Sequence, residues 1–176
     1  MISHGLIAAA MFFVTGCFYE RTKTLSIPNM GGLAKVLPIT FAFFLASSLA
    51  SLALPGMSGF ISEITIFLGV TNQENFTTLF RVTTVAIAAI GLVLTPMYLL
   101  SMCRRVFFGP RIPALAFIDD MRPRELVIGL TLMVPTLVIG VWPRIAMDFY
   151  EAATDALASD LGTHSLIALT TLLPAG

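Results

Sequence analysis

The chain has 176 residues, of which 57% are apolar and 11% are charged, with ten basic residues balanced by ten acidic ones. Soluble domains average roughly 45–50% apolar and about 25% charged residues, so this composition excludes an ordinary soluble domain and also a disordered chain. The zero net charge excludes a nucleic-acid-binding domain, which needs clustered Lys and Arg. The remaining class is an integral membrane protein.

Four apolar, charge-poor stretches predict transmembrane helices at about residues 1–20, 36–72, 82–104 and 125–142. Each approaches or exceeds the roughly 20 residues that cross a bilayer as helix. The first stretch is not a signal peptide, because its charged residues begin at Glu20, after the apolar part rather than before it. The sequence therefore predicts an all-α membrane domain over residues 1–145.

The second stretch is too long for one continuous crossing. As an unbroken helix, Val36 to Asn72 would extend about 55 Å, against a hydrocarbon core of about 30 Å. Pro55, Gly56 and Gly59 predict a break near residues 55–59. A single interrupted crossing places eight of the ten Lys and Arg residues on one side, whereas two crossings divide them equally. The positive-inside rule favours the single, discontinuous helix, with residues 20–35 and 104–125 on the cytoplasmic or equivalent side.

The C-terminal residues, 146–176, are predicted to form a tail outside the membrane domain. Residues 146–157 alternate apolar and acidic positions at helical spacing, which is typical of an amphipathic helix at the membrane surface. The final apolar run, residues 165–174, is too short to cross a bilayer.

Glu63 is the main candidate for a functional residue. A carboxylate inside a membrane helix costs roughly 2.5–3.5 kcal/mol and is usually kept for a function. It follows the predicted break by about one helical turn, where discontinuous transporter helices expose backbone groups to water. The pattern predicts a proton-exchanging residue; the alternative is a carboxylate near the water interface.

His4 is the second candidate, since histidine titrates near neutral pH and can relay protons. A single helical histidine can equally be an interhelical hydrogen-bond donor, and spacing leaves both interpretations open. The serines of the second stretch could hydrate a path or bond to neighbouring helices. Four arginines are most simply topological anchors: Arg104, Arg105, Arg122 and Arg124.

Nothing in the sequence predicts a bound cofactor. The two cysteines, Cys17 and Cys103, lie in separate apolar runs, so no cysteine cluster is available for an iron–sulfur centre. There is also no Gly-rich turn for a nucleotide and no pair of intramembrane histidines for a haem. We expect no cofactor in this chain.

Four short motifs resemble a known family. They are Met1–Leu6 (MISHGL), Tyr19–Thr22 (YERT), Met30–Leu33 (MGGL) and Leu54–Glu63 (LPGMSGFISE). Their order and spacing resemble the antiporter-like subunits of the proton-pumping NAD(P)H–quinone oxidoreductases, the complex I family. The run Ala50–Gly59 is most similar to the chain 4 type of cyanobacteria and plastids.

The resemblance implies that this chain is a C-terminal fragment of a longer subunit, whose bundle is built from inverted repeats. Its second helix corresponds to the broken helix of the second repeat. Glu63 then takes the position of the terminal proton-channel residue, and His4 that of the intramembrane histidine in the preceding helix. The upstream channel residues of the family have no counterpart here.

The resemblance also implies a function. The chain would be a non-redox, proton-translocating subunit in the membrane arm of an enzyme that passes electrons from NAD(P)H or ferredoxin to plastoquinone in a thylakoid membrane. Iron–sulfur clusters and plastoquinone are expected in other subunits. The expected partners are the other membrane-arm subunits, the lipid bilayer and transported protons, and no nucleic acid. The alternatives are a subunit of a multi-subunit cation/proton antiporter and a purely structural membrane subunit in which Glu63 has no role.

Overall fold

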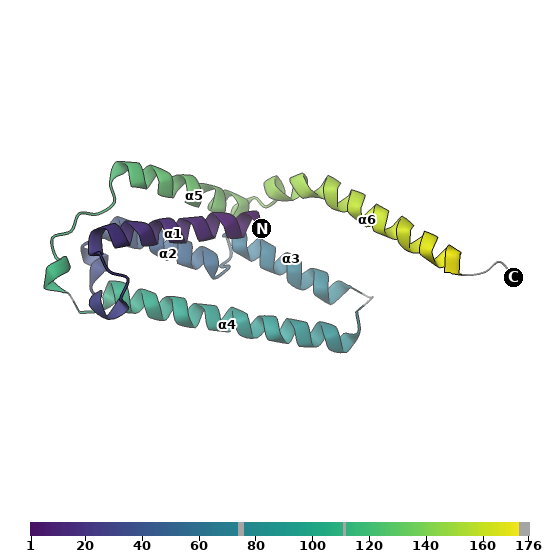
Figure 1. Cartoon of the computed structure of the whole chain (residues 1–176), viewed down its shortest axis with the longest axis horizontal. Helices are drawn as coiled ribbons and strands as arrows, with labels where there is room; N and C mark the ends of the chain where they lie inside the picture. The colour runs from purple at the N-terminus through teal and green to yellow at the C-terminus, as the bar shows by residue number, and fades with distance from the viewer. Residues whose placement is uncertain (74–75, 111, 173–176) are drawn as a thin grey trace. The chain divides into compact units, whose positions relative to one another are not determined.

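The structure is a computed structural model that describes residues 1–73, 76–110 and 112–172, with side chains described as far as residue 160. The described residues form helices and loops, with no strand among them (Figure 1). The predicted all-α class is confirmed. The α-helices are α1 (Ile2–Thr22), α2 (Pro38–Ser51), α3 (Ser58–Asn72), α4 (Thr78–Phe108), α5 (Pro123–Val141) and α6 (Arg144–Leu172).

The chain divides into two compact units, Met1–Val141 and Trp142–Gly176. The first unit contains α1 to α5, and the described part of the second is mainly α6. Within the first unit, α1 packs against α2 and α5, and α3 packs against α4 and α5. The division into functional domains at residue 145 stays a prediction.

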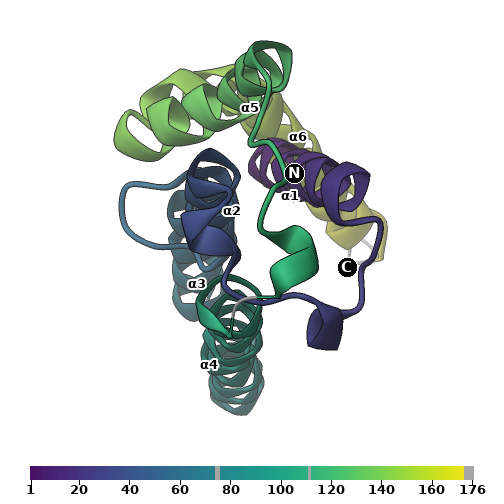
Figure 2. The ribbon, with the colours of Figure 1, turned by 90° about the vertical axis from the view of Figure 1, so that its left-hand side faces the viewer.

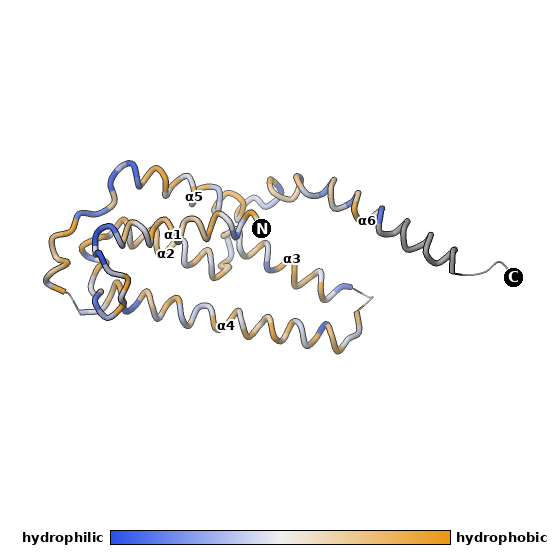
Figure 3. Tube along the Cα trace, in the orientation of Figure 1, coloured by the Kyte–Doolittle hydropathy of each residue, from blue (hydrophilic) through white to orange (hydrophobic). Residues whose placement is uncertain are grey.

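Within the part of the chain that the structure describes, three helices are long and apolar enough to cross a membrane by themselves: α1, α4 and α5. Hydrophobic residues run along the whole of α4, and most of this helix is uncovered by the rest of the chain (Figure 3). Such a surface is stable only against lipid or another protein, so the chain is an integral membrane protein. The predicted fourth crossing would be formed by α2 and α3 together, and the count of four crossings stays a prediction.

The predicted interruption of the second helix is confirmed. α2 has 14 residues and α3 has 15, and the segment between them, residues 52–57, contains two residues in the left-handed backbone region, Ala53 (φ 51°) and Gly56 (φ 94°). This backbone cannot continue an α-helix. The end of α5 packs closely against the segment between α2 and α3. Gly140 of α5 has no room for a side chain there, since an added Cβ would lie 2.3 Å from the Gly56 carbonyl oxygen.

One end of the bundle is held by an aromatic cluster. Phe18 of α1, Phe44 of α2 and Phe107 of α4 pack edge-on or tilted, with ring centroids 5.2–6.1 Å apart. Leu33 and Leu37 from the connection between α1 and α2 are fully buried beside them. Figure 2 shows this end, where α1 finishes and α2 begins.

A polar network closes the same end. Arg21, in the last turn of α1, forms an ion pair with Glu125 of α5 and donates hydrogen bonds to the carbonyl oxygens of Asp119 (2.8 Å) and Asp120 (3.0 Å). The structure thus brings the two connections predicted to share a membrane side, residues 20–35 and 104–125, to one end of the bundle. Which side of the membrane they face stays a prediction.

The second unit differs from the expected tail. α6 is one helix from Arg144 to Leu172, longer than the predicted segment at 146–157. An exposed ion pair joins Arg144 Nε to Asp148 Oδ1 one turn later, at 3.7 Å. Part of the predicted apolar run at 165–174 lies outside the described residues.

Candidate functional site

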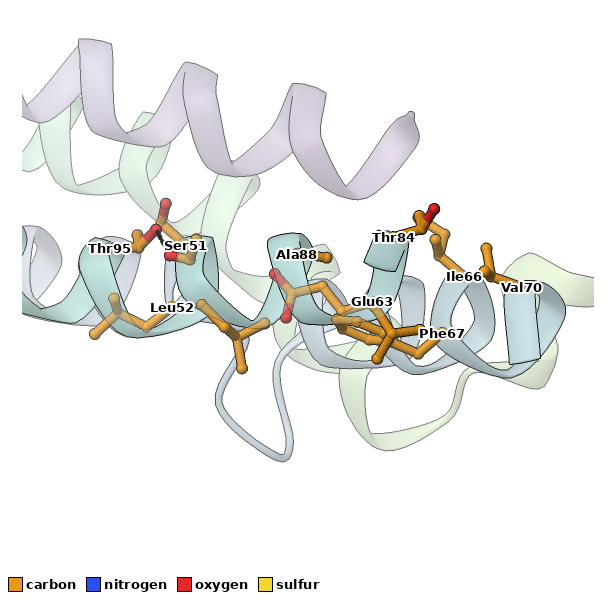
Figure 4. A pocket seen from close by; sticks show the side chains of 12 residues that line it. Ser51, Leu52, Glu63, Ile66, Phe67, Val70, Thr84, Ala88 and Thr95 are labelled. Atoms are coloured by element: carbon orange, nitrogen blue, oxygen red, sulfur yellow. Dashed lines mark hydrogen bonds between the residues drawn. The ribbon is translucent and has the colours of Figure 1, made fainter. Parts of the chain in front are cut away.

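Glu63 lies in the second turn of α3, just after the break. It is half-buried and lines a cavity of about 260 Å³ formed by α3, α4 and the end of α2 (Figure 4). In this view the carboxylate points toward the side of the cavity where Ser51 and Leu52 lie. The broken helix therefore presents its only carboxylate to a cavity rather than packing it against a neighbouring helix.

The cavity is apolar with a few hydroxyl groups. Ile66, Phe67 and Val70 of α3 supply apolar wall, while Ser51 of α2 and two threonines of α4 supply hydroxyls. The hydroxyl of Thr95, one of these threonines, donates to the Gly91 carbonyl at 2.9 Å (Figure 4). A carboxylate in such surroundings is stabilised by water or by taking up a proton.

Glu63 has no cationic partner in the part of the chain that the structure describes. The two ion pairs found there are Arg21–Glu125 and Arg144–Asp148, and no hydrogen bond reaches the Glu63 carboxylate. A structural role for a membrane carboxylate normally shows as a salt bridge or a set of donors. Neither is found for Glu63 among the described residues.

Two buried hydroxyls flank the break without partners. The Oγ atoms of Ser48 in α2 and Ser58 at the start of α3 are buried, and neither makes a hydrogen bond within the described residues. Buried polar atoms of this kind are commonly satisfied by an internal water molecule. The break thus offers polar positions for water on both of its sides.

His4 lies in the first turn of α1 with an exposed side chain, and it is not among the residues that line the cavity of Glu63. The chain segments do meet, because the Ser62 hydroxyl donates to the Ser3 hydroxyl at 3.3 Å. The structure therefore brings the neighbours of the two predicted residues together but does not place His4 and Glu63 in one cavity.

Asp120 is an important residue that the sequence reasoning missed. Its carboxylate accepts hydrogen bonds from the Ile39 N–H (2.6 Å), from the Thr40 N–H (3.1 Å) and hydroxyl (2.6 Å), and from the Met121 N–H (2.7 Å). It therefore caps the start of α2 from about 80 residues away. Burial alone would raise the pKa of Asp120, but these hydrogen bonds outweigh burial and hold the pKa below its usual value.

Glu125 was also missed, although its local signal is readable. The Arg122 N–H donates to Glu125 Oε2 at 2.7 Å, so a glutamate in the first turn of α5 reaches back to the residue before the helix. A Glu three residues after a helix cap is a recognised start signal. Its second role, the ion pair with Arg21, depends on a residue 104 positions away.

The described residues contain no group of three or more His, Cys, Asp or Glu side chains that could hold a metal ion. Cys17 and Cys103 are both free and buried. The expectation that cofactors lie in other subunits stays a prediction.

Comparison with known proteins identifies the family. The transmembrane family described as NADH:quinone oxidoreductase/Mrp antiporter matches residues 1–95. The chain belongs to this family. The matched region contains α1, the broken helix with Glu63 and the first part of α4.

Curated relatives are named as chain 4 subunits of NAD(P)H-quinone oxidoreductases. The chain is 54% identical over 165 residues to chain 4 1 of Synechococcus elongatus, which covers 93% of this chain and 31% of the relative. It is 50% identical over 160 residues to chain 4 2 of Thermosynechococcus vestitus, covering 90% of this chain and 30% of the relative. These matches confirm the resemblance to the chain 4 type. The chain spans less than a third of the length of these relatives.

Proposed function

We propose that this chain forms part of a proton-translocation channel in the membrane arm of an NAD(P)H–quinone oxidoreductase. The observation that carries the proposal is the position of Glu63, a carboxylate without a cationic partner among the described residues, facing a cavity directly after a helix break. The names of the curated relatives support the assignment to this enzyme class.

Glu63 takes up a proton from the interior of the membrane and releases it on the side opposite to residues 20–35 and 104–125. α2 starts at the end of the bundle that holds those residues. The other end is marked by the hydrogen bond from Arg81 of α4 to the Thr71 carbonyl of α3, at 3.0 Å. Glu63 lies beyond the break on the path toward that second end, as expected of an exit residue.

Water supported by Ser48 and Ser58 carries the proton past the break. Both hydroxyls are buried without partners in the described chain, and the left-handed backbone at residues 53 and 56 interrupts the helical hydrogen bonds between them. Hydroxyl groups and interrupted backbone allow a chain of water molecules in an otherwise apolar bundle.

His4 relays protons toward Glu63 in this proposal. Its support is the ability of an imidazole ring to accept and donate a proton, together with the contact between the neighbouring serines, Ser3 and Ser62. Because His4 is exposed in the described chain, its relay partner lies on another element of the longer protein or on another subunit.

The chain acts as a non-redox subunit. Iron–sulfur clusters and plastoquinone belong to other subunits of the complex, and the other membrane-arm subunits are its partners. NAD(P)H or ferredoxin supplies the electrons. The cyanobacterial sources of the relatives support a location in the thylakoid membrane.

A cation/proton antiporter subunit is the second candidate, because the family description names Mrp antiporters together with the oxidoreductases. A protonatable carboxylate at a broken helix would serve both functions. Proton movement that requires an electron donor and a quinone favours the oxidoreductase, whereas donor-independent exchange of a cation for protons favours the antiporter.

The variant Glu63→Gln tests the proposal in the assembled complex reconstituted into vesicles. It keeps the size of the side chain and removes its proton exchange. We expect normal assembly, a strongly reduced proton yield per electron and, where coupling is tight, slower electron transfer. Glu151→Gln, at an exposed position of α6, is the matched control and should keep the wild-type yield. A wild-type yield in Glu63→Gln would refute the channel assignment.

A further inference from the structure

The cavity of Glu63 extends along the contact between α3 and α4, in the direction away from the break. Its lining continues along α3 to Val70 and along α4 to Thr84. Figure 4 shows Ser51 and Thr95 at one end of the cavity, on the side of the break. Thr84 and Val70 lie at the other end, and Glu63 lies between the two ends. The cavity therefore leads from Glu63 to the last turn of α3 as well as to the break.

Thr84 differs from the neighbouring threonines because its hydroxyl group is free. The hydroxyls of Thr71, Thr83 and Thr95 each donate to a carbonyl oxygen one turn earlier in their own helix. The Thr84 hydroxyl makes no hydrogen bond to any residue that the structure describes, although Thr84 is half-buried and lines the cavity. A free hydroxyl group in this position can hold a water molecule inside the cavity.

Arg81 lies one turn before Thr84 in α4, just past the end of the cavity. Its Nη1 donates to the Thr71 carbonyl oxygen at 3.0 Å, which joins the start of α4 to the last turn of α3. Its Nε is buried and has no hydrogen-bond partner in the described chain. Water is the usual partner of a buried N–H when the protein supplies none. Arg81 and Thr84 are three positions apart, so their side chains lie on the same face of the helix.

We propose that a proton leaving Glu63 travels along this cavity on a row of water molecules held by Thr84 and Arg81, and reaches the membrane side opposite to residues 20–35. The proton passes from the Glu63 carboxyl group to the nearest water, and the last water releases a proton to the bulk, so the row is restored. Arg81 keeps its own proton and is a positioning residue, because a guanidinium group only donates hydrogen bonds. The proton step rests on the proposed function of Glu63, whereas the row of water can be tested without turnover.

The length of the path fits a short row of water. Ala88 lies level with Glu63 in Figure 4, and Arg81 precedes Ala88 by seven residues, or about 10 Å along a helix. Hydrogen-bonded oxygen atoms are about 2.8 Å apart, so about three or four water molecules cover this distance. Four water molecules occupy about 120 Å³ at the density of the liquid. The cavity, at about 260 Å³, has room for them.

The first test locates the water in the assembled complex at rest, in nanodiscs. Radiolysis by a short X-ray pulse turns bound water into hydroxyl radicals, which label the side chains beside it, and mass spectrometry locates the labels. Ile66 lines the cavity, whereas Ile64 in the same helix is exposed and does not line it. We expect Ile66 to be labelled about fivefold faster than Ile64, because the cavity holds ordered water. Equal labelling of the two isoleucines would overturn the proposal.

The second test measures donor-driven proton pumping by the complex in vesicles. Thr84→Val keeps the shape of the side chain and removes the hydroxyl, and we expect the pumping rate to fall about fivefold through the loss of one hydrogen bond to the row. Thr84→Ser restores the hydroxyl and should restore the rate, whereas a role in packing alone predicts the opposite order. Thr83→Val is the matched control, since its hydroxyl only bonds to carbonyl oxygens of its own helix, and it should pump at the wild-type rate.

Arg81→Leu removes the buried Nε–H and should lower both the labelling of Ile66 and the pumping rate. Arg104→Leu, at an exposed position near the other end of α4, should change neither. A wild-type pumping rate in Thr84→Val would overturn the proposal. If Ile66 is labelled as expected while Glu63→Gln pumps normally, the row of water is supported and the proposed proton step at Glu63 is refuted.

Discussion

The cap that Asp120 places on α2 predicts a specific loss of stability. In the wild type, Oδ1 of Asp120 accepts three hydrogen bonds and Oδ2 accepts one, from the Ile39 N–H at 2.6 Å. In Asp120→Asn the amide oxygen can replace Oδ1. The NH2 group then takes the place of Oδ2 and cannot accept the hydrogen bond from the Ile39 N–H. The variant loses one hydrogen bond to a charged group, about 1.5 kcal/mol, and about 0.5 kcal/mol of attraction between the carboxylate and the helix dipole. We expect the free energy of unfolding to fall by about 2 kcal/mol.

Denaturant titration of the chain in detergent micelles measures this loss at neutral pH. Asp119→Asn is the matched control, because the Asp119 side chain is exposed and its structural contact is made by its backbone carbonyl, which accepts from Arg21. A change within about 0.5 kcal/mol is expected for the control. Equal losses in the two variants would refute the capping argument.

The difference in the free energy of unfolding between wild type and Asp120→Asn should also depend on pH. In the folded protein the pKa of Asp120 is below its usual value. The stabilisation by its carboxylate is therefore complete above the pKa of the unfolded chain, about 3.9, and is lost as the pH falls through the folded-state pKa. The stability difference between wild type and Asp120→Asn should stay constant from pH 5 to 8 and shrink below about pH 4. If the stability difference between the two proteins is unchanged at pH 3, the ionised Asp120 carboxylate is not the group that stabilises the start of α2.

Three further predictions follow from the break, the topology and the proposed relay. Single cysteines at Asn29 and Asn72 should react with an impermeant reagent from opposite membrane faces; reaction from one face would mean that the second helix crosses twice. Gly140→Ala should lower the free energy of unfolding by about 1–3 kcal/mol, because its Cβ would lie 2.3 Å from a carbonyl oxygen of the break, whereas Gly5→Ala, in open space, should not destabilise. A comparable loss in both would argue against close packing at the break. His4→Ala should lower the proton yield per electron in the assembled complex without impairing assembly, and an unchanged yield would leave His4 with a structural role.

The local features of this fold were predictable from the sequence, and the long-range ones were not. The break near Pro55 follows from residue types that disfavour helix, and the placement of Glu63 beyond it follows from simple counting along the chain. The roles of Asp120 and Arg21 depend on partners about 80–104 residues away, and loop residues carry no periodicity that would indicate such contacts. The sequence gives Arg21 a place in the YERT motif and among the positive charges that set topology, but it does not indicate that the Arg21 guanidinium joins α1 to α5.

The most direct test of the proton-channel account is whether Glu63 changes its protonation state during turnover. Infrared difference spectroscopy of the assembled complex detects the C=O stretch of a protonated carboxyl group when electron donor and quinone are added. Proton transfer through Glu63 predicts a band that appears in wild type and in Glu151→Gln and is missing in Glu63→Gln. An identical band in Glu63→Gln, or no carboxyl band in the wild-type complex while it pumps protons, would contradict it.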